Sequence, residues 1–169
     1  MTDEESFDAL YVVARERLVA QIYLFTGDAV ESADLVQNAF EKAWRRWDHV
    51  SVLDEPEAWV RLVAFNLAKN HRRWQRHVSP RATVVPSTAD PIESEEGIRE
   101  VGLALLRLPI NHRRALILHH VVGLSVREVA TEMAVAPGTV MSWLHRGRQA
   151  LAVALREFEP NSHGQDHEA

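Results

Sequence analysis

The sequence predicts an all-α protein made of two small helical domains joined by a flexible linker. On both sides of residues 78–97, apolar residues recur at the three- and four-residue spacing of amphipathic helices. The stretch 78–97 itself contains Pro80, Pro86 and Pro91 with several Ser and Thr and then acidic residues, which is a linker composition. Strand-like alternation of useful length does not occur outside Ala82–Val85. The expected organisation is a domain at 1–77, a linker at 78–97, a domain at 98–158 and a disordered polar tail at 159–169.

The composition is that of a soluble globular protein, because 46% of the 169 residues are hydrophobic and 25% are charged. Cysteine is absent, which excludes disulfides, thiolate zinc sites and a thiol nucleophile and is compatible with a reducing cytoplasm. The acidic start lacks the pattern of a signal peptide, and no apolar run approaches the roughly 20 residues that span a bilayer. We therefore expect a cytoplasmic protein without membrane insertion. The net charge of -5 argues against a nucleic-acid partner unless the basic residues are segregated.

The N-terminal domain begins with two predicted helices. The first runs from Ser6, its expected N-cap, to Thr26, and Gly27 ends it. Asp28 caps a second helix that extends to about Trp47. Its expected buried stripe is Val36, Phe40, Ala43, Trp44 and Trp47, and a polar strip beside it contains Asp34, Gln37, Glu41 and Arg45. The large aromatic residues either fill a three-helix core or lie partly at a partner surface.

A third helix starts at Asp54–Glu57, where Pro56 is tolerated in the first turn and the acids favour the positive end of the dipole. Its expected inward residues are Trp59, Leu62, Val63 and Leu67, and its polar stripe is Asn66, Lys69, Asn70 and Arg73. Between positions 61 and 77 the charged residues are all basic: Arg61, Lys69, Arg72, Arg73 and Arg76. Basic residues interleaved with Trp74 suit phosphates and unstacked bases. The alternative is a solvated helix end whose cations favour the C-terminal dipole.

The C-terminal domain is predicted to end in a helix-turn-helix. A helix over 98–108 stops before Pro109, a supporting helix covers 111–122, and Gly123 ends it. Ser125 and Glu128 form a capping box at the start of the next helix. After a turn at 134–136, the second helix of the motif starts at Pro137.

The second helix of this motif has an apolar and a polar side. The apolar side contains Val140, Trp143, Leu144, Gly147 and Leu151, while Gly138, Met141, Ser142, His145, Arg148 and Gln149 lie on the other and Arg146 on a flank. A short helix, a tight turn and a second helix with a polar outer face form the geometry that enters a major groove. A helical hairpin packed into a bundle is the alternative reading.

Enzymatic and metal chemistry find no support in the sequence. It contains no glycine-rich phosphate loop, GxSxG elbow or HExxH motif. His119 and His120 are adjacent and would point about 100° apart on a helix, so they do not share a metal by themselves. The carboxylates lie on exposed faces without an identifiable acid–base pair. We expect no cofactor and no catalytic residue.

Apart from the tail, the chain resembles an extracytoplasmic-function (group 4, sigma-70 family) sigma factor of bacterial RNA polymerase. Residues 33–44, ADLVQNAFEKAW, match the polymerase-binding helix of its sigma-2 domain, and residues 59–73, WVRLVAFNLAKNHRR, match its promoter-melting helix. Leu108-Pro109, Gly123–Ser125, Glu128–Ala130, Pro137–Val140 and Arg146–Arg148 match the sigma-4 domain. Blocks from both domains in the right order, with a linker between them, make this resemblance more specific than a lone helix-turn-helix.

The resemblance implies a role for each block. Polymerase binding would fall to Asp34, Gln37, Phe40, Glu41 and Trp44. The minus-10 element and its exposed bases would be engaged by Arg61, Asn66, Lys69, Asn70, Arg72 and Arg73, since an amide can bond the polar edge of a flipped base. The minus-35 element would be read by Arg127, Gly138, Thr139, Met141, Ser142, His145, Arg146 and Arg148. The implied partners are core RNA polymerase, promoter DNA and an anti-sigma factor, and the linker would run toward the RNA exit path.

The sequence departs from the family pattern at the start of, and within, the second helix of the helix-turn-helix, which we call the recognition helix. Ala136 stands where the family commonly has Ser, so that a helix cap worth about 1 kcal/mol is lost. Met141 and Trp143 replace frequent cations, which predicts weaker and less salt-dependent DNA binding by this domain alone.

A stand-alone helix-turn-helix regulator that binds duplex DNA without polymerase is the main alternative function. It would account for the C-terminal half, but it leaves the helix around Asp34 and the stripe around Asn66 without a role. A helical enzyme or scaffold is a further alternative, which the absence of a catalytic constellation makes improbable.

Overall fold

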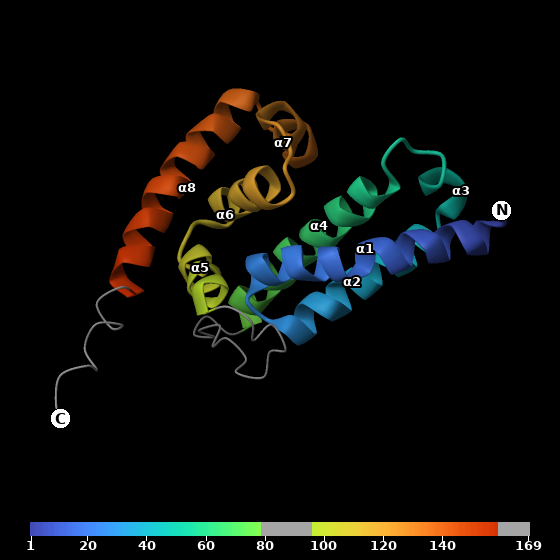
Figure 1. The fold of residues 1–169 in the computed structure, drawn as a ribbon, viewed down its shortest axis with the longest axis horizontal. Helices are drawn as coiled ribbons and strands as arrows, with labels where there is room; N and C mark the ends of the chain where they lie inside the picture. The colour runs from blue at the N-terminus through green and yellow to red at the C-terminus, as the bar shows by residue number, and fades with distance from the viewer. Residues whose placement is uncertain (79–95, 159–169) are drawn as a thin grey trace. The chain divides into compact units, whose positions relative to one another are not determined.

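The computed structural model describes residues 1–78 and 96–158, with the side chains of 74–78 and 96–98 outside the description. All secondary structure in these ranges is helical, which confirms the predicted all-α class (Figure 1). The chain divides into two compact units, 1–87 and 88–169. The expected linker and the polar tail lie almost entirely outside the described residues. None of the described helices combines the length and the apolar character that a membrane crossing requires.

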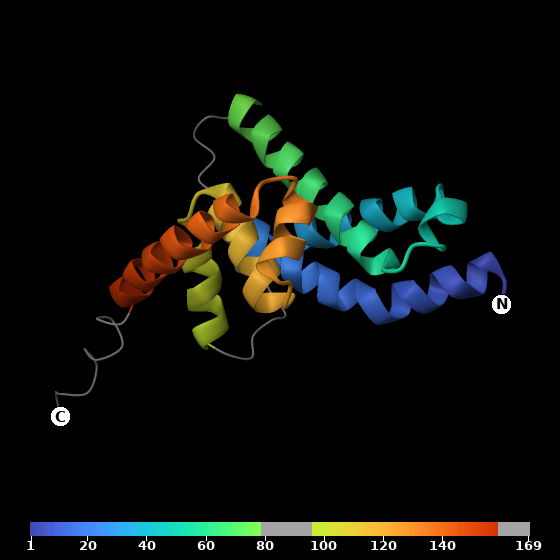
Figure 2. The same ribbon diagram turned by 90° about the horizontal axis from the view of Figure 1, so that it is seen from above.

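Unit 1 is a bundle of three long helices and one short one. Its elements are α1 (Asp3–Thr26), α2 (Ala29–Trp44), α3 (Trp47–Val50) and α4 (Pro56–Val78). Helices α1, α2 and α4 pack against one another in pairs, and Figures 1 and 2 show α1 and α2 joined by a tight turn. Leu18, Ile22 and Phe25 of α1 are fully buried, so this side of the helix forms part of the core.

Helix α1 starts one turn earlier than the sequence predicted. Its N-cap is Thr2, whose hydroxyl accepts a hydrogen bond from the Glu5 amide at 3.2 Å, while the Thr2 amide donates to Glu5 Oε2 at 2.7 Å. The assignment of Ser6 as the cap is therefore wrong. A full capping box satisfies two amides, whereas a lone Ser satisfies one, so the box sets the start of the helix.

The turn between α1 and α2 has the predicted residues at both helix ends. Gly27 takes a left-handed conformation with φ 76° and ends α1, and the Asp28 carboxylate accepts a bond from the Glu31 amide at 2.9 Å. A buried contact of 2.7 Å between the hydroxyls of Thr26 and Ser32 ties the two helices together across this turn. The turn is therefore fixed by polar contacts on both sides of Gly27.

The second helix ends before Trp47, which contradicts its expected extension. Helix α2 stops at Trp44, and Trp47 begins the separate short helix α3. Trp47 is buried and its indole N–H donates to the Ser6 hydroxyl at 3.0 Å. Trp44 is 47% exposed, so its placement in the buried stripe is also wrong, because Phe7, Phe40 and Trp47 fill the aromatic cluster without covering its outer side.

Helix α4 turns a different face to the core than expected. Its most buried apolar residues are Val60, Ala64, Phe65 and Ala68, whereas Trp59, Leu62, Val63 and Leu67 are only partly buried. Because α4 packs against both α1 and α2, its central stripe is lined largely by alanines. Alanine contributes little to a hydrophobic pattern, and the larger flanking residues misled the prediction.

Unit 2 contains the predicted helix-turn-helix and its supporting helices. Its elements are α5 (Glu96–Leu106), α6 (Ile110–Leu116), the π-helical turn η1 (Ile117–Val121), α7 (Val126–Met133) and α8 (Pro137–Phe158). Helix α8 packs against α5, α6 and α7. The expected supporting helix 111–122 is thus α6 continued by a π turn, and Gly123, with φ 88°, ends it as predicted.

Arg113 has a structural role that the sequence did not indicate. The residue is 3% exposed, and its guanidinium donates to the carbonyls of Leu105, Leu106 and Leu108 at 2.8 to 2.9 Å. These carbonyls lie at and just beyond the end of α5, where the regular helical hydrogen bonds stop; the Leu105 carbonyl also accepts from the Leu108 amide at 3.1 Å. Arg113 therefore caps α5 and fixes the corner between α5 and α6.

Candidate nucleic-acid and polymerase interfaces

The outer face of α2 presents most of the residues assigned to polymerase binding. Asp34, Gln37 and Glu41 are exposed, and Trp44 continues the same face. Phe40 is only 1% exposed and packs against the rings of Phe7 and Tyr11. Its burial argues against a direct polymerase contact and favours a supporting position beneath this face.

A groove of about 290 Å³ runs between this face and α1. Its aromatic walls come from Phe7, Tyr11, Phe40 and Trp44, and its polar residues are Gln37, Glu41 and Arg45. The Tyr11 hydroxyl donates to Gln37 Oε1 at 2.9 Å and thereby orients the amide at the groove. The contribution of α1 was missed from the sequence, although a partner surface was one of the two expected locations of the large aromatic residues of α2.

On α4, four polar residues form one exposed stripe, as the spacing predicted. Asn66, Lys69, Asn70 and Arg73 are all exposed. At 3.6 residues per turn they fall within an arc of about 100° around the helix. The stripe offers two amides and two cations, which can bond base edges and phosphates respectively.

Two further cations assigned to the minus-10 element lie elsewhere on α4. Arg61 is 5% exposed, which is at odds with a phosphate contact. Arg72 is half-buried, and its guanidinium donates to the Thr26 carbonyl at the end of α1. Neither cation lies on the exposed stripe. Trp74 and Arg76 have side chains outside the described part of the chain.

Glu31 faces α4 from the first turn of α2. Its carboxylate lies 3.7 Å from His71 Nε2. Burial raises the pKa of Glu31, and the nearby His71 and Arg72 partly oppose that shift. The carboxylate is thus held in a site of low polarity where basic groups of α4 are its charge partners.

The helix-turn-helix of unit 2 has the predicted local structure. The Ser125 hydroxyl accepts from the Glu128 amide at 3.2 Å, and the Ser125 amide donates to the Glu128 carboxylate at 2.7 Å, which completes the capping box of α7. Ala134 then takes a left-handed conformation in the turn before α8. Val129 and Ala130 are buried, as expected where α7 crosses α8.

The outer face of this motif carries the residues assigned to the minus-35 element. The exposed members are Arg127, Gly138, Met141, His145, Arg146 and Arg148, while Thr139 and Ser142 are half-buried. Met141 is 61% exposed. The face therefore combines basic groups for phosphates, hydrogen-bonding groups for base edges and apolar groups for thymine methyl groups.

The inner face of α8 is held closely against α6. A Cβ at Gly147 would lie 3.0 Å from Leu116 Cδ1, and Val140 and Leu144 are buried on the same side. Trp143 is half-buried, and its ring lies 6.4 Å from that of His112. This close approach fixes the position of the recognition helix on its support.

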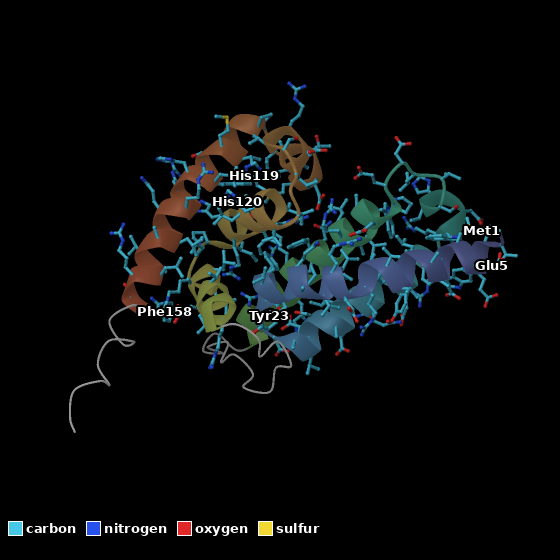
Figure 3. All side chains as sticks on the ribbon, in the orientation of Figure 1. Met1, Glu5, Tyr23, His119, His120 and Phe158 are labelled. Carbon is cyan, nitrogen blue, oxygen red and sulfur yellow. The ribbon has the colours of Figure 1, made fainter. Side chains whose placement is uncertain are left out.

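His119 and His120 are neighbours on the π-helical turn that continues α6 (Figure 3). The His119 Nδ1–H donates to the Leu124 carbonyl at 2.7 Å, and the rings of His119 and His120 are 4.8 Å apart. Burial and the nearby Arg146 lower the pKa of His112, and burial, His119 and Arg148 lower that of His120. Within residues 1–78 and 96–158, no group of three potential metal ligands occurs.

Comparison with known proteins identifies both units. Residues 10–78 match the family model "Sigma-70 region 2", and residues 98–151 match "Sigma-70, region 4". The RNA polymerase sigma-H factor of Pseudomonas aeruginosa is 30% identical, with 91% of this chain and 88% of the relative covered. The ECF RNA polymerase sigma factor SigL of Mycobacterium tuberculosis is also 30% identical, over 79% of each chain.

A solved structure agrees with these matches. The sigma factor RpoE of Bartonella quintana, in complex with the anti-sigma factor NepR, superposes with a TM-score of 0.74 at 25% identity. The match covers 89% of this chain and 96% of that one. The chain therefore belongs to the extracytoplasmic-function group of sigma-70 family RNA polymerase sigma factors, which are non-enzymatic subunits that direct transcription initiation.

Proposed function

We propose that this sigma factor binds core RNA polymerase through the exposed face of α2. Asp34, Gln37 and Glu41 supply the polar contacts, and the groove beside Trp44 receives an apolar part of the polymerase. Phe40 supports the groove from below. The groove is rich in aromatic residues, and enrichment of aromatic residues is a feature of protein–protein interfaces.

Promoter DNA is engaged by two separate surfaces in this proposal. The stripe of Asn66, Lys69, Asn70 and Arg73 contacts the minus-10 element and its unpaired bases, and the outer face of α7 and α8 reads the minus-35 element. The observation that supports this assignment is that polar and apolar side chains lie on opposite sides of these helices. On each helix the proposed contact residues lie outside, and the apolar residues on the other side pack into the unit.

Control by an anti-sigma factor and a cytoplasmic location are further parts of the proposal. The Bartonella quintana RpoE to which this chain is similar was solved with an anti-sigma factor, and a comparable partner here would compete with polymerase for the free protein. Bacterial transcription takes place in the cytoplasm, where a polymerase subunit has to be located.

Run-off transcription with purified core polymerase on genomic fragments tests this function. Defined transcripts that depend on the added chain support it and also identify the promoter. Failure of the chain to bind bacterial core polymerase, or to start transcription from any fragment across a range of salt concentrations, contradicts it.

The runner-up function is a stand-alone regulator that binds duplex DNA. The capped helix-turn-helix of unit 2 is compatible with that activity. It assigns no role to the outer face of α2 or to the stripe on α4. Tight, sequence-specific duplex binding without polymerase would favour the regulator over the promoter-specificity subunit.

A further inference from the structure

The far side of α4 is attached to the turn between α1 and α2. The Arg72 guanidinium donates to the Thr26 carbonyl, and His71 Nε2 lies 3.7 Å from Glu31 Oε1. We refer to Thr26, Glu31, His71 and Arg72 as the turn clamp. It joins the end of α1 and the start of α2 to the half of α4 that carries the basic residues.

The turn clamp rests on a well-ordered framework of hydrogen bonds. The Thr26 hydroxyl accepts from the Asp28 amide at 3.1 Å and contacts the Ser32 hydroxyl at 2.7 Å. The Ser32 hydroxyl also lies 2.6 Å from the Asp28 carbonyl, to which it donates. These bonds fix the backbone of the turn, and with it the Thr26 carbonyl that accepts from Arg72.

Helical geometry places the turn clamp opposite the proposed DNA contacts. At 3.6 residues per turn, His71 and Arg72 lie on either side of the direction opposite the stripe of Asn66, Lys69, Asn70 and Arg73. The four stripe residues are exposed, whereas His71 and Arg72 are half-buried. The side of α4 that carries His71 and Arg72 thus attaches the helix to the α1–α2 turn, and the side that carries the stripe remains open to a ligand.

We propose that Arg72 is a positioning residue for promoter opening rather than a DNA ligand, and that it acts by anchoring α4 to the α1–α2 turn. This inference rests on the proposed role of α4 at the minus-10 element. Arg72 fixes the rotation of the helix, so that the amides of Asn66 and Asn70 face the unpaired strand. Glu31 contributes from α2 by holding the basic groups of α4 toward the turn.

Glu31→Ala distinguishes this role from direct DNA binding by the sign of its effect. The substitution removes a negative charge near Arg72, so Arg72 would bind DNA more strongly if its guanidinium were a phosphate ligand. If Arg72 anchors the helix instead, Glu31→Ala weakens promoter opening. Glu16→Ala is the matched control, because it removes the same charge from an exposed site on α1.

The measurement uses full-length protein with core polymerase on a promoter fragment recovered by the wild-type holoenzyme. Permanganate reactivity of unpaired thymines gives the open-complex fraction, a fluorescence titration gives core affinity, and thermal unfolding confirms that each variant is folded at the assay temperature. We expect Arg72→Gln to lower the open-complex fraction about tenfold, near the lower range for a hydrogen bond to a charged group, with core affinity unchanged. Glu31→Ala lowers it several-fold, and Glu16→Ala does not lower it.

A double variant provides the second criterion. Once the anchor is lost in Arg72→Gln, adding Glu31→Ala has little further effect, because Glu31 acts by holding the Arg72 guanidinium toward the turn. Two results would overturn the inference: multiplicative losses in the double variant, or a Glu31→Ala protein that opens the promoter as well as the wild type or better. If the wild-type holoenzyme opens no promoter, the proposed function fails instead, so the two failures are distinguishable.

Discussion

Ala134 occupies a backbone conformation that L-amino acids rarely adopt. Its φ of 54° and ψ of 46° lie in the left-handed region, where it ends α7 and leads into α8. Cβ makes this conformation costly by about 1 kcal/mol or more, and glycine avoids that cost. The recognition helix of this protein is thus connected through a strained residue.

We predict that Ala134→Gly stabilises the protein by about 1 kcal/mol, since relief of the left-handed strain outweighs the added freedom of the unfolded chain. Denaturant unfolding followed by circular dichroism measures the change. Ala150→Gly is the control, because Ala150 is an exposed residue inside α8 where the same substitution should cost about 1 kcal/mol. Destabilisation by both substitutions would contradict the assigned strain.

Asn66 provides a prediction about the proposed minus-10 surface. Its exposed amide lies at the centre of the α4 stripe, so Asn66→Ala should impair promoter opening while core polymerase binding stays intact. The expected loss is about tenfold, which corresponds to one or two hydrogen bonds to a base edge. Permanganate footprinting and a core titration on the same samples separate the two steps. An unchanged open-complex yield would remove Asn66 from this surface.

At the level of residues, the sequence was informative where a contact is local. Asp28 and the Ser125–Glu128 box could be predicted because cap and amide are three residues apart, and Gly27 because glycine tolerates the left-handed conformation. The Thr2–Glu5 box is equally local but was missed. The anchoring of Arg72 and the capping by Arg113 could not, because their acceptors are backbone carbonyls of another helix. Every residue has a backbone carbonyl, so the sequence does not show which arginines bind one. Such an arginine is therefore predicted to be available for DNA.

Helix α2 presents the surface on which polymerase binding is proposed to depend. Asp34→Arg reverses a charge on its exposed face, and we predict that it weakens binding to core polymerase by at least about tenfold, since an introduced like charge at an interface costs several kcal/mol. A pull-down with core polymerase, followed by a fluorescence titration, gives the affinity. Glu16→Arg makes the same charge change on the exposed side of α1 and should bind normally. Equal affinities for the two variants would count against α2 as the docking helix.

Two histidines, His112 of α6 and His120 of η1, predict that the stability of unit 2 depends on pH. The pKa values of His112 and His120 are lowered, chiefly by burial, so the unfolded chain takes up these protons at a higher pH than the folded one. Stability is therefore full above a pH of about 6.5 and is lost as the pH falls through the lowered values.

We predict that the melting temperature falls less steeply between about pH 7 and pH 5 in a His112→Gln/His120→Gln variant than in the wild type. Differential scanning calorimetry of the full chain at a series of pH values measures both slopes. Groups common to the two proteins cancel in the difference. Parallel slopes would show that these two histidines do not carry the effect.

Whole helices were easier to predict than their orientation. Periodicity located α1, α2, α4 and α8, but it did not identify which side of α4 is buried, nor that Trp44 is exposed. Hydrophobicity scales give most weight to large side chains. A tightly packed helix often buries small ones instead, as Ala64 and Ala68 show in unit 1.

At the scale of the whole molecule, the proposed function divides promoter recognition between two units of an acidic chain, each with a modest basic surface. The net charge is -5, so the protein as a whole repels DNA at long range. Each unit alone offers few phosphate contacts. When both units are bound to polymerase and one of them has contacted the promoter, the other would bind the same DNA intramolecularly.

We predict that the free chain binds a duplex promoter at least about 100-fold more weakly than the holoenzyme does. In the holoenzyme, the binding of one unit to DNA raises the effective concentration of the other unit at its site, and the gain in affinity is of this order. Electrophoretic mobility shifts at fixed salt, with and without core polymerase, make the comparison. The same fragment with a scrambled minus-35 element serves as the control. Comparable affinities for the two forms would favour the stand-alone regulator.

The combination of motifs, rather than any one of them, made the family recognisable from the sequence. The helix-turn-helix of unit 2 is shared by many regulators, whereas its order after the blocks around Asp34 and Asn66 is specific. The aromatic groove of unit 1 depends on how α1 and α2 cross. No local sequence pattern encodes that crossing, so the groove emerged only from the fold.

The close contact of Gly147 with Leu116 shows that the two sides of α8 have different roles. On one side of the helix a methyl group at position 147 would lie 3.0 Å from Leu116 Cδ1, so Leu116 would have to shift, whereas Met141 and His145 on the other side are exposed. If the outer side reads the minus-35 element as proposed, substitutions there can change promoter preference while the packing of α8 on α6 stays as it is. This makes the protein a starting point for orthogonal sigma factors in engineered gene circuits.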